Sequence, residues 1–532
     1  MSENITTVKY DTSDGKNVLR LCGRIDSSNA EASEKLMLSL LPSPVPDTLV
    51  IDASDLEYIS SAGLRILMRL RKQTNKKLPI TETAQPIYEI FEVTGFTELF
   101  DISKKMRRIS VDGCEIIGRG FYGTVYRIDE ETIVKVYKSA DSLSMIQNEK
   151  RLARLALIAG VPTAISYDIV RVGDSYGSVF ELLNARSFSK ILSTEPDKFD
   201  WCVKEYVGML KKIHSTEVPA GKLPDMKETA VSWAAFMQDH LPAEYGKKLL
   251  SLVRAVPHDD HMIHGDYHTK NLELQGDEVL IIDMDTLAVG HPVFELASMY
   301  NSFVGYSEVD HNVIKRFQGF DFETGRAFWR SSLASYLGTD DPAKIKEVED
   351  KARIIGYTRM IRRSIRRGGY DTEAGRAEIE LWTKELTGLL DRVDSLVFTP
   401  CELEVAADGR ELPRVISFIE SHLEQAGCPA KTAMQISVAS EEIFVNIANY
   451  AYGDGKGTAT VRAGVTDGVF TLTFSDSGKP FDPTKVPDPD VTLPAEERGM
   501  GGLGIFMTKK ITDEVRYERV GGKNVLTLIK KI

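Results

Sequence analysis

HGDYHTKNLELQGDEVLIIDMD, residues 264–285, is the stretch of the chain with the densest polar chemistry. Asn271 follows Asp266 by five residues. In phosphoryl-transfer loops this spacing places a carboxylate that receives the acceptor's proton beside a carboxamide that holds a magnesium ion. An apolar strand, VLIID, then ends at Asp283, where a second carboxylate could coordinate the same metal. The stretch therefore predicts a phosphoryl-transfer site.

A local explanation competes with this one, because each polar side chain could simply satisfy backbone groups of its own loop. The upstream sequence favours phosphate binding. Residues 118–126, GRGFYGTVY, indicate a glycine-rich turn that enters a strand. Gly118, Gly120 and Gly123 would let backbone amides approach a phosphate without a side chain between them.

A lysine and a glutamate extend the pattern. The apolar strand TIVKVY carries Lys135 directly after the glycine turn, where a lysine is expected to pair with phosphates. The ordinary alternative is an exposed lysine of an edge strand. Glu149 lies on the helical run SMIQNEKRLARLAL, at a separation suited to an ion pair with Lys135. The glycine turn, the pair and the loop together predict one nucleotide site.

Residues 113 to about 390 resemble protein-kinase-like phosphotransferases of the aminoglycoside phosphotransferase and choline kinase type, whose loop has the form HGDxHxxN. The resemblance implies a bilobal fold, ATP and Mg²⁺ as cofactors, and Asp266 as the catalytic base. It implies Asn271 and Asp283 as magnesium ligands. Lys135 and Glu149 would be the nucleotide pair, under a lid formed by the glycine turn.

Two positions depart from that family. Met284 and Asp285 follow Asp283 where protein kinases have Phe-Gly, which favours the small-molecule branch. Glu295, in HPVFELA, stands where the family more often has Asp, and we expect catalysis to tolerate it.

Length, charge and cysteine usage limit the classes of protein. At about 100 to 200 residues per domain, 532 residues predict three or four domains. A net charge of −12 argues against a nucleic-acid-binding surface. The five cysteines form no CxxC pair, so neither a disulfide framework nor a zinc site is predicted. Without a signal pattern or an apolar run of about 18 residues, we expect a cytoplasmic protein with no membrane partner.

The first 105 residues alternate strand and helix patterns around the apolar strand TLVIDA, which predicts a small α/β layer domain. Ser60 and Ser61 fall at the start of the helix SAGLRILMRLRKQ. Either hydroxyl could cap that helix. The same position would stabilise a phosphate on the hydroxyl, because a helix N-terminus offers free amides and positive potential.

The pattern IDASDLEYISSAGLRIL, with GRID at residues 23–26, resembles the STAS domains of anti-sigma factor antagonists. In that family a regulated serine precedes Ser/Ala-Gly-Leu, which corresponds here to Ser61. Ser60 stands where many relatives have Asp. Both hydroxyls are therefore candidate phosphoacceptors.

Three segments near the C-terminus point to a second nucleotide site. The helical run KTAMQISVASEEIFVNIANYAY places Glu442, Asn446 and Asn449 on one face. The strand FTLTFSD ends at Asp476 and is followed by Gly478. A second glycine-rich turn, RGMGGLG, opens another helix and contains Gly499, Gly501, Gly502 and Gly504. The Pro- and acid-rich stretch PTKVPDPDVTLPAEE between them predicts a mobile lid.

Residues 405–532 resemble the GHKL ATPase domain of anti-sigma factor serine kinases. The resemblance implies Glu442 as the base for a serine, Asn446 as the magnesium ligand and Asp476 as the acceptor of the adenine amino group. Gly478 and the glycines of residues 499–504 would border the nucleotide. A sensor histidine kinase shares this fold, but the short segment before Glu442 leaves no room for a phosphoacceptor hairpin.

One basic run has two explanations. It belongs to one predicted helix, and its members are Arg353, Arg359, Arg362, Arg363, Arg366 and Arg367. A solvated helix face is the default. The sharper alternative is a surface for an anionic substrate or partner, such as an acidic neighbouring module.

The sequence thus predicts a multidomain α/β and α+β chain: a STAS α/β layer domain (1–108), a bilobal protein-kinase-like domain (109–398) and a GHKL α/β sandwich (399–532). We expect a bacterial cytosolic partner-switching protein with ATP-dependent serine kinase activity. Its partners would be anti-sigma or antagonist proteins, its own STAS domain among them, and GHKL relatives suggest a homodimer. A small-molecule kinase with regulatory flanking domains and a non-catalytic nucleotide-sensing scaffold are the alternatives.

Overall fold

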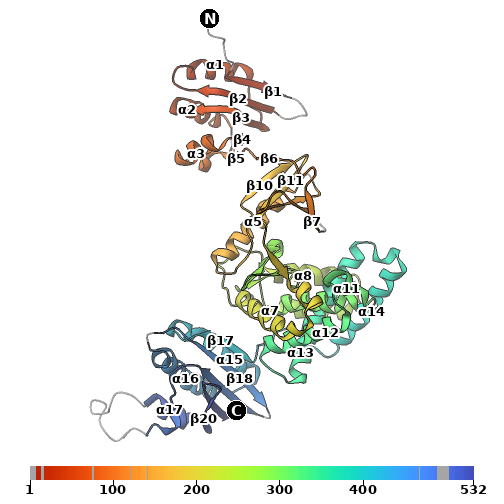
Figure 1. The fold of residues 1–532 in the computed structure, drawn as a ribbon, viewed down its shortest axis with the longest axis vertical. Coiled ribbons are helices and arrows are strands. Elements are labelled where there is room, and N and C mark those ends of the chain that lie inside the picture. Colours follow the sequence, from red (N-terminus) through yellow and green to blue (C-terminus); the bar gives the residue numbers. More distant parts are fainter. Residues whose placement is uncertain are drawn as a thin grey trace, which may run out of the picture. The chain divides into compact units, whose positions relative to one another are not determined.

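The computed structural model describes residues 7–12, 17–74, 77–120, 123–139, 142–453, 455–466, 468–487 and 503–532. Its elements are drawn in Figure 1. The chain divides into two compact units. One comprises residues 1–150 and 165–182, and the other comprises residues 151–164 and 183–532.

The first unit begins with a five-stranded sheet in the order β1-β2-β3-β4-β5. Strands β2 to β5 are parallel and β1 is antiparallel to β2. The strands are β1 (Val8–Asp11), β2 (Asn17–Ile25), β3 (Leu49–Ile59), β4 (Pro79–Thr83) and β5 (Asp101–Lys104). The helices between them are α1 (Ala30–Leu40), α2 (Ser61–Arg71), α3 (Gln85–Val93) and α4 (Phe96–Leu99). The predicted α/β layer domain is confirmed.

Helix α2 packs closely on this sheet. A Cβ on Gly63 would lie 2.7 Å from Ile59 Cγ1 and 3.0 Å from the carbonyl oxygen of Ile25. Leu64 and Leu67 bury the apolar stripe of α2 in the same core. The absence of a side chain at Gly63 therefore lets the helix N-terminus lie directly on the sheet.

A second sheet in this unit has the strand order β6-β10-β11-β9-β8-β7. Its strands are β6 (Arg108–Ile109), β7 (Glu115–Arg119), β8 (Gly123–Arg127), β9 (Thr132–Tyr137), β10 (Asp168–Val172) and β11 (Ser175–Glu181). Helix α5 (Leu143–Ile158) follows β9. The predicted strand TIVKVY coincides with β9. Because β6 comes from the connection between the two sheets and pairs with β10, that connection is ordered.

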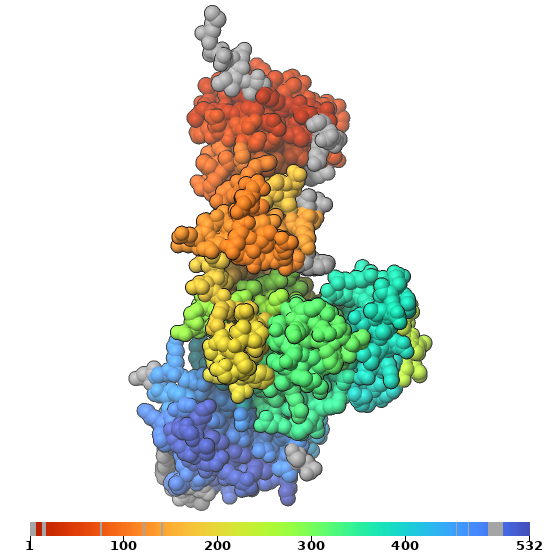
Figure 2. Space-filling model, turned by 45° about the vertical axis from the view of Figure 1, so that its right-hand side comes forward, coloured from red at the N-terminus to blue at the C-terminus, as the bar shows by residue number. Residues whose placement is uncertain are grey.

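The larger unit contains a mainly helical body. Helix α10 is buried along its whole length, so the other helices pack around it. The helices are α6 (Phe188–Thr194), α7 (Phe199–His214), α8 (Met226–Met237), α9 (Ala243–Ala255), α10 (Val293–Phe303), α11 (Asn312–Gln318), α12 (Phe322–Leu337), α13 (Pro342–Arg366) and α14 (Glu373–Leu390). Helices α10 to α14, green to cyan, form one continuous mass in Figure 2.

Two small sheets carry the loop of residues 264–285. One sheet is β12 (Ala185–Ser187), β14 (Leu272–Gln275) and β15 (Glu278–Ile281), and the other is β13 (Met262–Ile263) and β16 (Ala288–Val289). The loop leaves β13, enters β14 and continues past β15, so Asp266 and Asn271 lie between β13 and β14 and Asp283 lies after β15.

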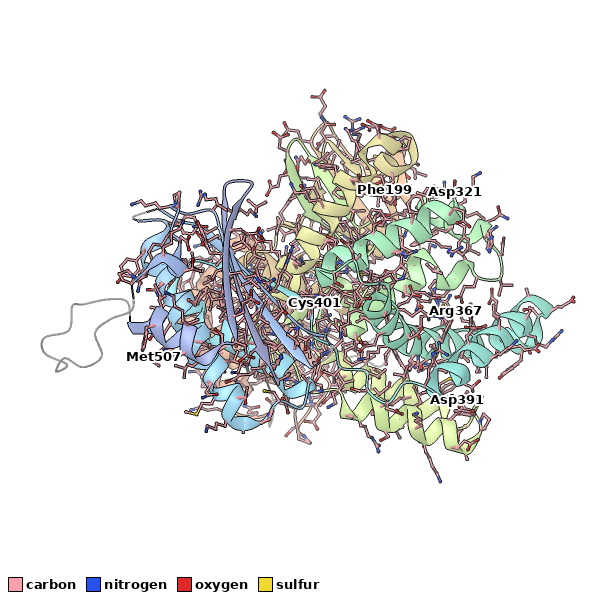
Figure 3. The ribbon with its side chains drawn as sticks, turned by 90° about the horizontal axis from the view of Figure 1, so that it is seen from below. Phe199, Asp321, Arg367, Asp391, Cys401 and Met507 are labelled. Atoms are coloured by element: carbon pink, nitrogen blue, oxygen red, sulfur yellow. The ribbon has the colours of Figure 1, made fainter. Side chains whose placement is uncertain are left out.

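The C-terminal part of this unit is an antiparallel sheet in the order β17-β18-β19-β21-β20 with helices packed against it. Its strands are β17 (Glu402–Ala406), β18 (Thr458–Thr466), β19 (Val469–Asp476), β20 (Glu514–Val520) and β21 (Lys523–Lys531). Its helices are α15 (Leu412–Gln425), α16 (Ala430–Asn446) and α17 (Leu503–Ile511). The sheet and its helices are visible in Figure 3 beside the labelled Cys401 and Met507. The expected α/β sandwich is confirmed.

The segment between α14 and β17 packs on the helical body. Leu396 and Phe398 are buried in its core, and the Cys401 amide donates to the carbonyl oxygen of Leu337 at 2.7 Å. Glu402 then pairs with Lys211 at 3.5 Å and with Arg462 at 2.6 Å. Within the described ranges, no helix combines the length and the apolar character needed to cross a bilayer.

Candidate active sites

The loop that begins at His264 owes its shape to a glycine. Gly265 has φ +83°, a left-handed conformation, and a Cβ there would lie 2.6 Å from the carbonyl oxygen of Thr286. The Thr286 hydroxyl donates to the His264 carbonyl oxygen at 2.8 Å. His264 Nε2 lies 3.1 Å from the Ile282 carbonyl oxygen. The loop is thus held against the segment that contains Asp283.

Asp266 and Asn271 are brought together by this loop. The Asn271 side chain is buried, and its Nδ2 donates to the Asp266 carbonyl oxygen at 3.0 Å. This hydrogen bond turns Asn271 Oδ1 to the opposite side of the carboxamide, as a cation ligand requires. The Ile282 amide donates to the Asn271 carbonyl oxygen at 2.9 Å, so the residue before Asp283 is tied to Asn271.

Asp283 adopts a conformation that is unusual for a residue with a side chain. Its φ is 64° and its ψ is 61°, in the left-handed region, and its side chain is exposed. Such conformations cost about 1–3 kcal/mol and concentrate at functional sites. The backbone strain supports a functional role for Asp283.

The Asp266 carboxylate lies in a cationic environment. Burial alone would raise its pKa, but a hydrogen bond and charge from His268, together with Arg359 and His264, lower the pKa to about 2. His268 Nε2 is 3.6 Å from Asp266 Oδ2. The side chain of Asp266 therefore remains ionised and able to accept a proton near neutral pH.

Glu295 supports the loop from behind. Its fully buried carboxylate accepts hydrogen bonds from the His264 amide and, at 3.0 Å, from the Gly265 amide. His214 Nε2 lies 3.9 Å from the same carboxylate, and His214 Nδ1 lies 2.7 Å from the Tyr336 hydroxyl. Sequence reasoning treated Glu295 only as a departure from a family pattern. The available signal was that Glu295 is the single charged residue of the run VFELASMYNSF.

Lys135 and Glu149 form the expected ion pair. Lys135 Nζ lies 3.0 Å from Glu149 Oε1, and the Tyr137 hydroxyl donates to Glu149 Oε2 at 2.6 Å. Glu149 is 9% exposed. Burial, together with the neighbouring Glu149 carboxylate, raises the pKa of Tyr137, so this hydroxyl stays protonated and can donate. Tyr137 was missed by sequence reasoning, although it is the next inward residue after Lys135 on β9.

The glycine turn has a close backbone approach at Gly123. A Cβ there would lie 2.4 Å from the carbonyl oxygen of Val136. The Gly120 amide donates to the Gly123 carbonyl oxygen at 2.8 Å, and Lys138 Nζ donates to the Gly120 carbonyl oxygen at 3.2 Å. Gly118 lies in β7. The structure describes these three glycines but not the two residues at the tip of the turn.

The two serines ahead of α2 have different environments. Ser60 is the N-cap, and its hydroxyl accepts from the Ala62 amide at 3.2 Å. Its own amide donates to the Ile25 carbonyl oxygen at 2.9 Å. Ser61 is the first helical residue and is exposed. Capping therefore involves Ser60 and leaves the Ser61 side chain at the surface.

Glu442 and Asn446 lie on the last two turns of α16. The Glu442 carboxylate is packed against Gly504 in the first turn of α17, where a Cβ would overlap it. A π-helical turn, Ile447–Ala451, follows Asn446, so Asn449 does not continue the regular α-helical face that the spacing predicted. Asn446 is half-buried and Asn449 is exposed.

Asp476 is held by an asparagine that sequence reasoning missed. Its carboxylate is 6% exposed, and Oδ1 accepts from the Gly478 amide at 2.8 Å and from Asn524 Nδ2 at 2.9 Å. Both of its hydrogen bonds to described residues go to Oδ1. Asn524 Oδ1 in turn accepts from Tyr517 and Arg519. A buried Asn in a strand pattern was the available signal.

Gly478 joins the Asp476 loop to the π-helical turn. A Cβ on Gly478 would lie 2.4 Å from the carbonyl oxygen of Ala451, which also accepts from the Lys479 amide at 2.8 Å. The segments that carry Asn446, Asp476 and Gly504 therefore converge. Gly499, Gly501 and Gly502 lie outside the described residues, as does most of the stretch predicted as a lid.

Two histidines have the environments of structural residues. His214 lies behind Glu295, as described above. His422 is buried in α15, with Nδ1 2.9 Å from the Phe418 carbonyl oxygen and burial lowering its pKa. Its position is that of a packed helix residue.

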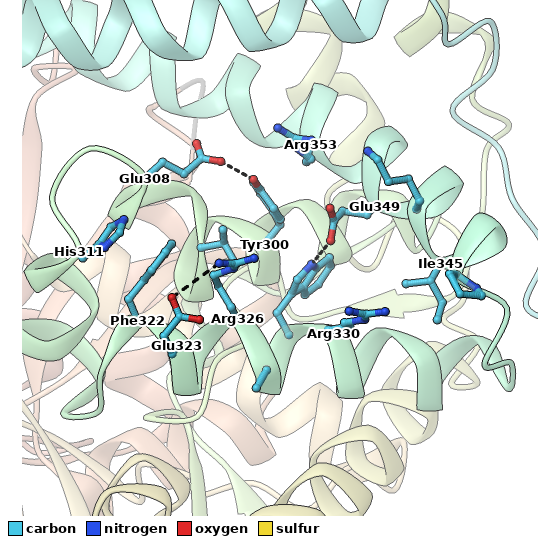
Figure 4. Close-up of a pocket in the computed structure, with 15 residues that line it drawn as sticks. Tyr300, Glu308, His311, Phe322, Glu323, Arg326, Arg330, Ile345, Glu349 and Arg353 are labelled. Carbon is cyan, nitrogen blue, oxygen red and sulfur yellow. Dashed lines mark hydrogen bonds and ion pairs between the residues drawn. The ribbon is translucent and has the colours of Figure 1, made fainter.

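A separate cavity of about 760 Å³ is lined by residues of α10, α12 and α13 and of the segment that follows α10 (Figure 4). Several polar groups of its wall contact one another. Glu308 Oε1 accepts from the hydroxyl of Tyr300, and Arg326 lies 3.6 Å from Glu323. Trp329 Nε1 donates to Glu349 at 2.8 Å. These pairs give the cavity wall its own hydrogen-bonded structure.

Three protein families match consecutive parts of the chain. The STAS family described as Mlab, STAS domain matches residues 8–102. The phosphotransferase enzyme family matches residues 113–330. The histidine kinase-like ATPase domain matches residues 405–530. These matches confirm the predicted order of the three kinds of domain.

Individual proteins match smaller or more distant parts. A protein of Bordetella bronchiseptica named as an anti-sigma factor antagonist, BtrV, is 32% identical over 96 residues, which are 18% of this chain and 82% of that protein. The structure of aminoglycoside phosphotransferase APH(2'')-Ib with ADP bound is 15% identical, covers 58% of this chain and 97% of its own, and has a TM-score of 0.36.

A choline/ethanolamine kinase family protein from Mesorhizobium loti is also 15% identical, covers 52% of this chain and 88% of its own, and has a TM-score of 0.35. Through residues 8–102 the chain belongs to the STAS-domain family of anti-sigma factor antagonists, and it joins that domain to a phosphotransferase-family domain and a histidine kinase-like ATPase domain.

Proposed function

We propose that this protein is a cytoplasmic, ATP-dependent regulator of the partner-switching type. Its C-terminal domain would phosphorylate a serine of a STAS domain, and its partners would be anti-sigma or antagonist proteins. The proposed domains are residues 1–108, 109–398 and 399–532. The observation that carries the proposal is the exposed hydroxyl of Ser61 in the first turn of α2, in a chain that also contains Glu442.

The proposed transfer uses one base and one acceptor. Glu442 takes the proton from the Ser61 hydroxyl, and Ser61 Oγ attacks the γ-phosphorus of ATP. The bond from that phosphorus to the bridging oxygen breaks, and ADP leaves. The phosphate would then lie at the N-terminus of α2, where backbone amides and the helix dipole favour negative charge.

The nucleotide would be held by the converging segments of the C-terminal domain. Asp476 Oδ2 would accept from the adenine amino group, because Oδ1 is occupied by Gly478 and Asn524. Asn446 would hold Mg²⁺. The glycines proposed to border the nucleotide are Gly478, Gly499, Gly501, Gly502 and Gly504.

The central domain would be a second phosphotransferase with Asp266 as its base. Lys135, paired with Glu149, would contact the nucleotide phosphates, and Gly118, Gly120 and Gly123 would let backbone amides approach them. Asn271 and Asp283 fit Mg²⁺ as oxygen ligands, because the Asn271 carboxamide is oriented by its hydrogen bond to Asp266. When bound, Mg²⁺ would neutralise charge on the phosphates.

Transfer of labelled phosphate from ATP and Mg²⁺ to the purified chain tests the proposal. The modified residue is mapped in the wild type, Asp266→Ala and Glu442→Ala. We expect label on Ser61 that is lost in Glu442→Ala and retained in Asp266→Ala. Loss only in Asp266→Ala would transfer the serine kinase role to the central domain and contradict the proposal for Glu442.

One mixture separates transfer within a chain from transfer between copies. The Ser60→Ala/Ser61→Ala chain is mixed with Glu442→Ala, so that one chain supplies the kinase and the other supplies the serines. Label on the Glu442→Ala chain would indicate transfer between copies. An unlabelled chain that still consumes ATP would require a separate acceptor, which contradicts transfer to its own STAS domain.

A further inference from the structure

Four arginines of the basic run lie along one side of the C-terminal half of α13. The first is Arg359, and Arg362, Arg363 and Arg366 follow it by three, four and seven residues. These spacings place the four side chains on neighbouring turns of one helix face. At 1.5 Å per residue, Arg359 and Arg366 are about 10 Å apart along the helix. Arg367, labelled in Figure 3, ends the helix.

The row begins at the proposed catalytic loop. Arg359 Nη1 donates to the Gly265 carbonyl oxygen at 3.2 Å and to the Ser298 hydroxyl at 3.1 Å. Gly265 directly precedes Asp266, and Arg359 contributes to the low pKa of that carboxylate. An acceptor whose hydroxyl reaches Asp266 would therefore meet Arg359.

Aromatic rings hold three of the guanidinium groups. Arg359 Cζ lies 5.6 Å from the ring centre of Trp233, and Arg362 Cζ lies 5.8 Å from that of Phe236. Both rings belong to α8. Arg363 Nη1 donates to the Tyr306 hydroxyl at 3.0 Å. Rings fix the planes of the guanidinium groups without neutralising their charge.

Carboxylates do not neutralise this row. Throughout the part of the chain that the structure describes, none of Arg359, Arg362, Arg363 and Arg366 has an Asp or Glu oxygen within 4.0 Å. Arg353, earlier on α13, contrasts with them, because it pairs with Glu385 at 2.7 Å and with Asp350 at 3.5 Å. Among the described residues, Arg353 is therefore in close ion pairs, whereas the four arginines of the row are not.

Arg362 adds an independent observation. Its Nε is buried and has no hydrogen-bond partner among the described residues. Burial, reinforced by the charge of Arg366, lowers the pKa of Arg362. Arg362 therefore keeps hydrogen-bonding capacity that no described residue uses.

We propose that this arginine row is the acceptor-binding surface of the central phosphotransferase domain, and that it takes an acidic protein segment carrying a serine or threonine. The inference rests on the proposed role of Asp266 and names the acceptor class of that site. A polycationic acceptor would be repelled by the same four charges. A row about 10 Å long matches an extended segment of about three residues, which suits a peptide better than a compact alcohol.

The chain itself contains a segment with this chemistry. Residues 52–64 carry Asp52, Asp55 and Glu57 ahead of the two serines. The side chains of Asp55 and Glu57 are exposed. This segment supplies a defined acidic probe.

The test measures binding of that probe to the full chain by fluorescence anisotropy. The labelled peptide of residues 52–64 is compared with the same peptide in which the three acidic residues are replaced by lysine. We expect the acidic peptide to bind the wild type and the Kd to rise at least tenfold in Arg362→Glu/Arg366→Glu. The lysine peptide should not bind, and kanamycin should not compete.

Arg330→Glu, an exposed arginine of α12, is the matched control and should leave the Kd within twofold. Arg366→Gln alone should weaken binding less than the double variant does, which separates a charge effect from misfolding. Absence of binding to the wild type, an equal Kd in the double variant, or preference for the lysine peptide would each overturn the proposal. Labelling of Ser61 through Glu442 does not involve α13, so its failure would contradict the proposed function and leave this result intact.

Discussion

The carboxylate of Glu295 accepts hydrogen bonds from the backbone amides of His264 and Gly265, the two residues directly ahead of Asp266. Two amides, one carboxylate and a left-handed glycine therefore set the direction in which Asp266 leaves β13.

Glu295→Gln should weaken the catalytic loop. A glutamine has one oxygen acceptor, and its amide group would face one of the two backbone N–H groups as a second donor. We expect the free energy of unfolding to fall by about 2 kcal/mol and ATP turnover by the central domain to fall at least tenfold. Denaturant unfolding and turnover in a Glu442→Ala background measure these effects. Glu323→Gln, on the exposed side of α12, should change neither.

His268→Gln should move the acid limb of the central domain's pH profile upward. The pKa of Asp266 is lowered to about 2 against the effect of burial, so the wild-type carboxylate loses its charge only as the pH falls through that value. His268→Gln removes the hydrogen bond and the charge that lower the pKa of Asp266. Burial, which raises that pKa, then has a larger net effect, so the pKa rises. The pH dependence of kcat/KM for ATP turnover, again in Glu442→Ala, measures the shift. An unchanged acid limb would show that Asp266 is not the titrating base.

Lys135→Met should impair the nucleotide site of the central domain and leave that of the C-terminal domain unchanged. It removes the cation 3.0 Å from the Glu149 carboxylate, which keeps its hydrogen bond from the Tyr137 hydroxyl. We expect a loss of at least tenfold in ATP turnover by the central domain and no change in labelling that depends on Glu442. Thermal unfolding checks that the domain remains folded, and Lys77→Met, an exposed lysine, is the control. Equal loss of both activities would contradict independent sites.

Asn524→Asp should weaken nucleotide binding by the C-terminal domain. The substitution places a second carboxylate where Nδ2 now donates to the buried Asp476 at 2.9 Å. Like charges at that distance repel, and the Asp476 loop would lose its position. We expect the affinity for ATP, measured by calorimetry in an Asp266→Ala/Lys135→Met background, to fall at least tenfold. Asn449→Asp, on the exposed π-helical turn, should have a smaller effect.

Ser60→Ala should affect stability, whereas Ser61→Ala should affect phosphate labelling. Ser60→Ala removes the N-cap acceptor of α2 and should lower the stability of the first domain by about 1 kcal/mol. Ser61→Ala removes an exposed hydroxyl and should change stability little but eliminate phosphate labelling. Thermal unfolding and mass mapping distinguish the two. Labelling that persists in Ser61→Ala and is lost in Ser60→Ala would move the phosphoacceptor to the capping residue.

Sequence patterns predicted the elements that local chemistry controls. The strand around Lys135, the helix that begins at Ser61 and the strand that ends at Asp476 all occur where periodicity and flanking residues placed them. The exception is the end of α16. The α-helical spacing predicted that Asn449 lies on the same face as Glu442 and Asn446. A π-helical turn begins at Ile447, so Asn449 leaves that face.

The basic run shows why the sequence positions of charged residues do not reveal which of them form ion pairs. In sequence, six arginines on one helix look equivalent. In the structure Arg353 is neutralised by Asp350 and Glu385, whereas Arg359 reaches the loop beside Asp266. The difference depends on which elements pack against each turn of α13.

By itself the sequence determined the order of the three domains and the residue types of each proposed site, because glycine turns, strand ends and helix starts are encoded within a few residues. Only the tertiary structure decided which residues support those sites. Glu295 lies 30 residues from Gly265, Asn524 lies 48 residues from Asp476, and Arg359 lies 94 residues from Gly265. Such contacts follow from the packing of distant segments around shared cores, which no local pattern specifies.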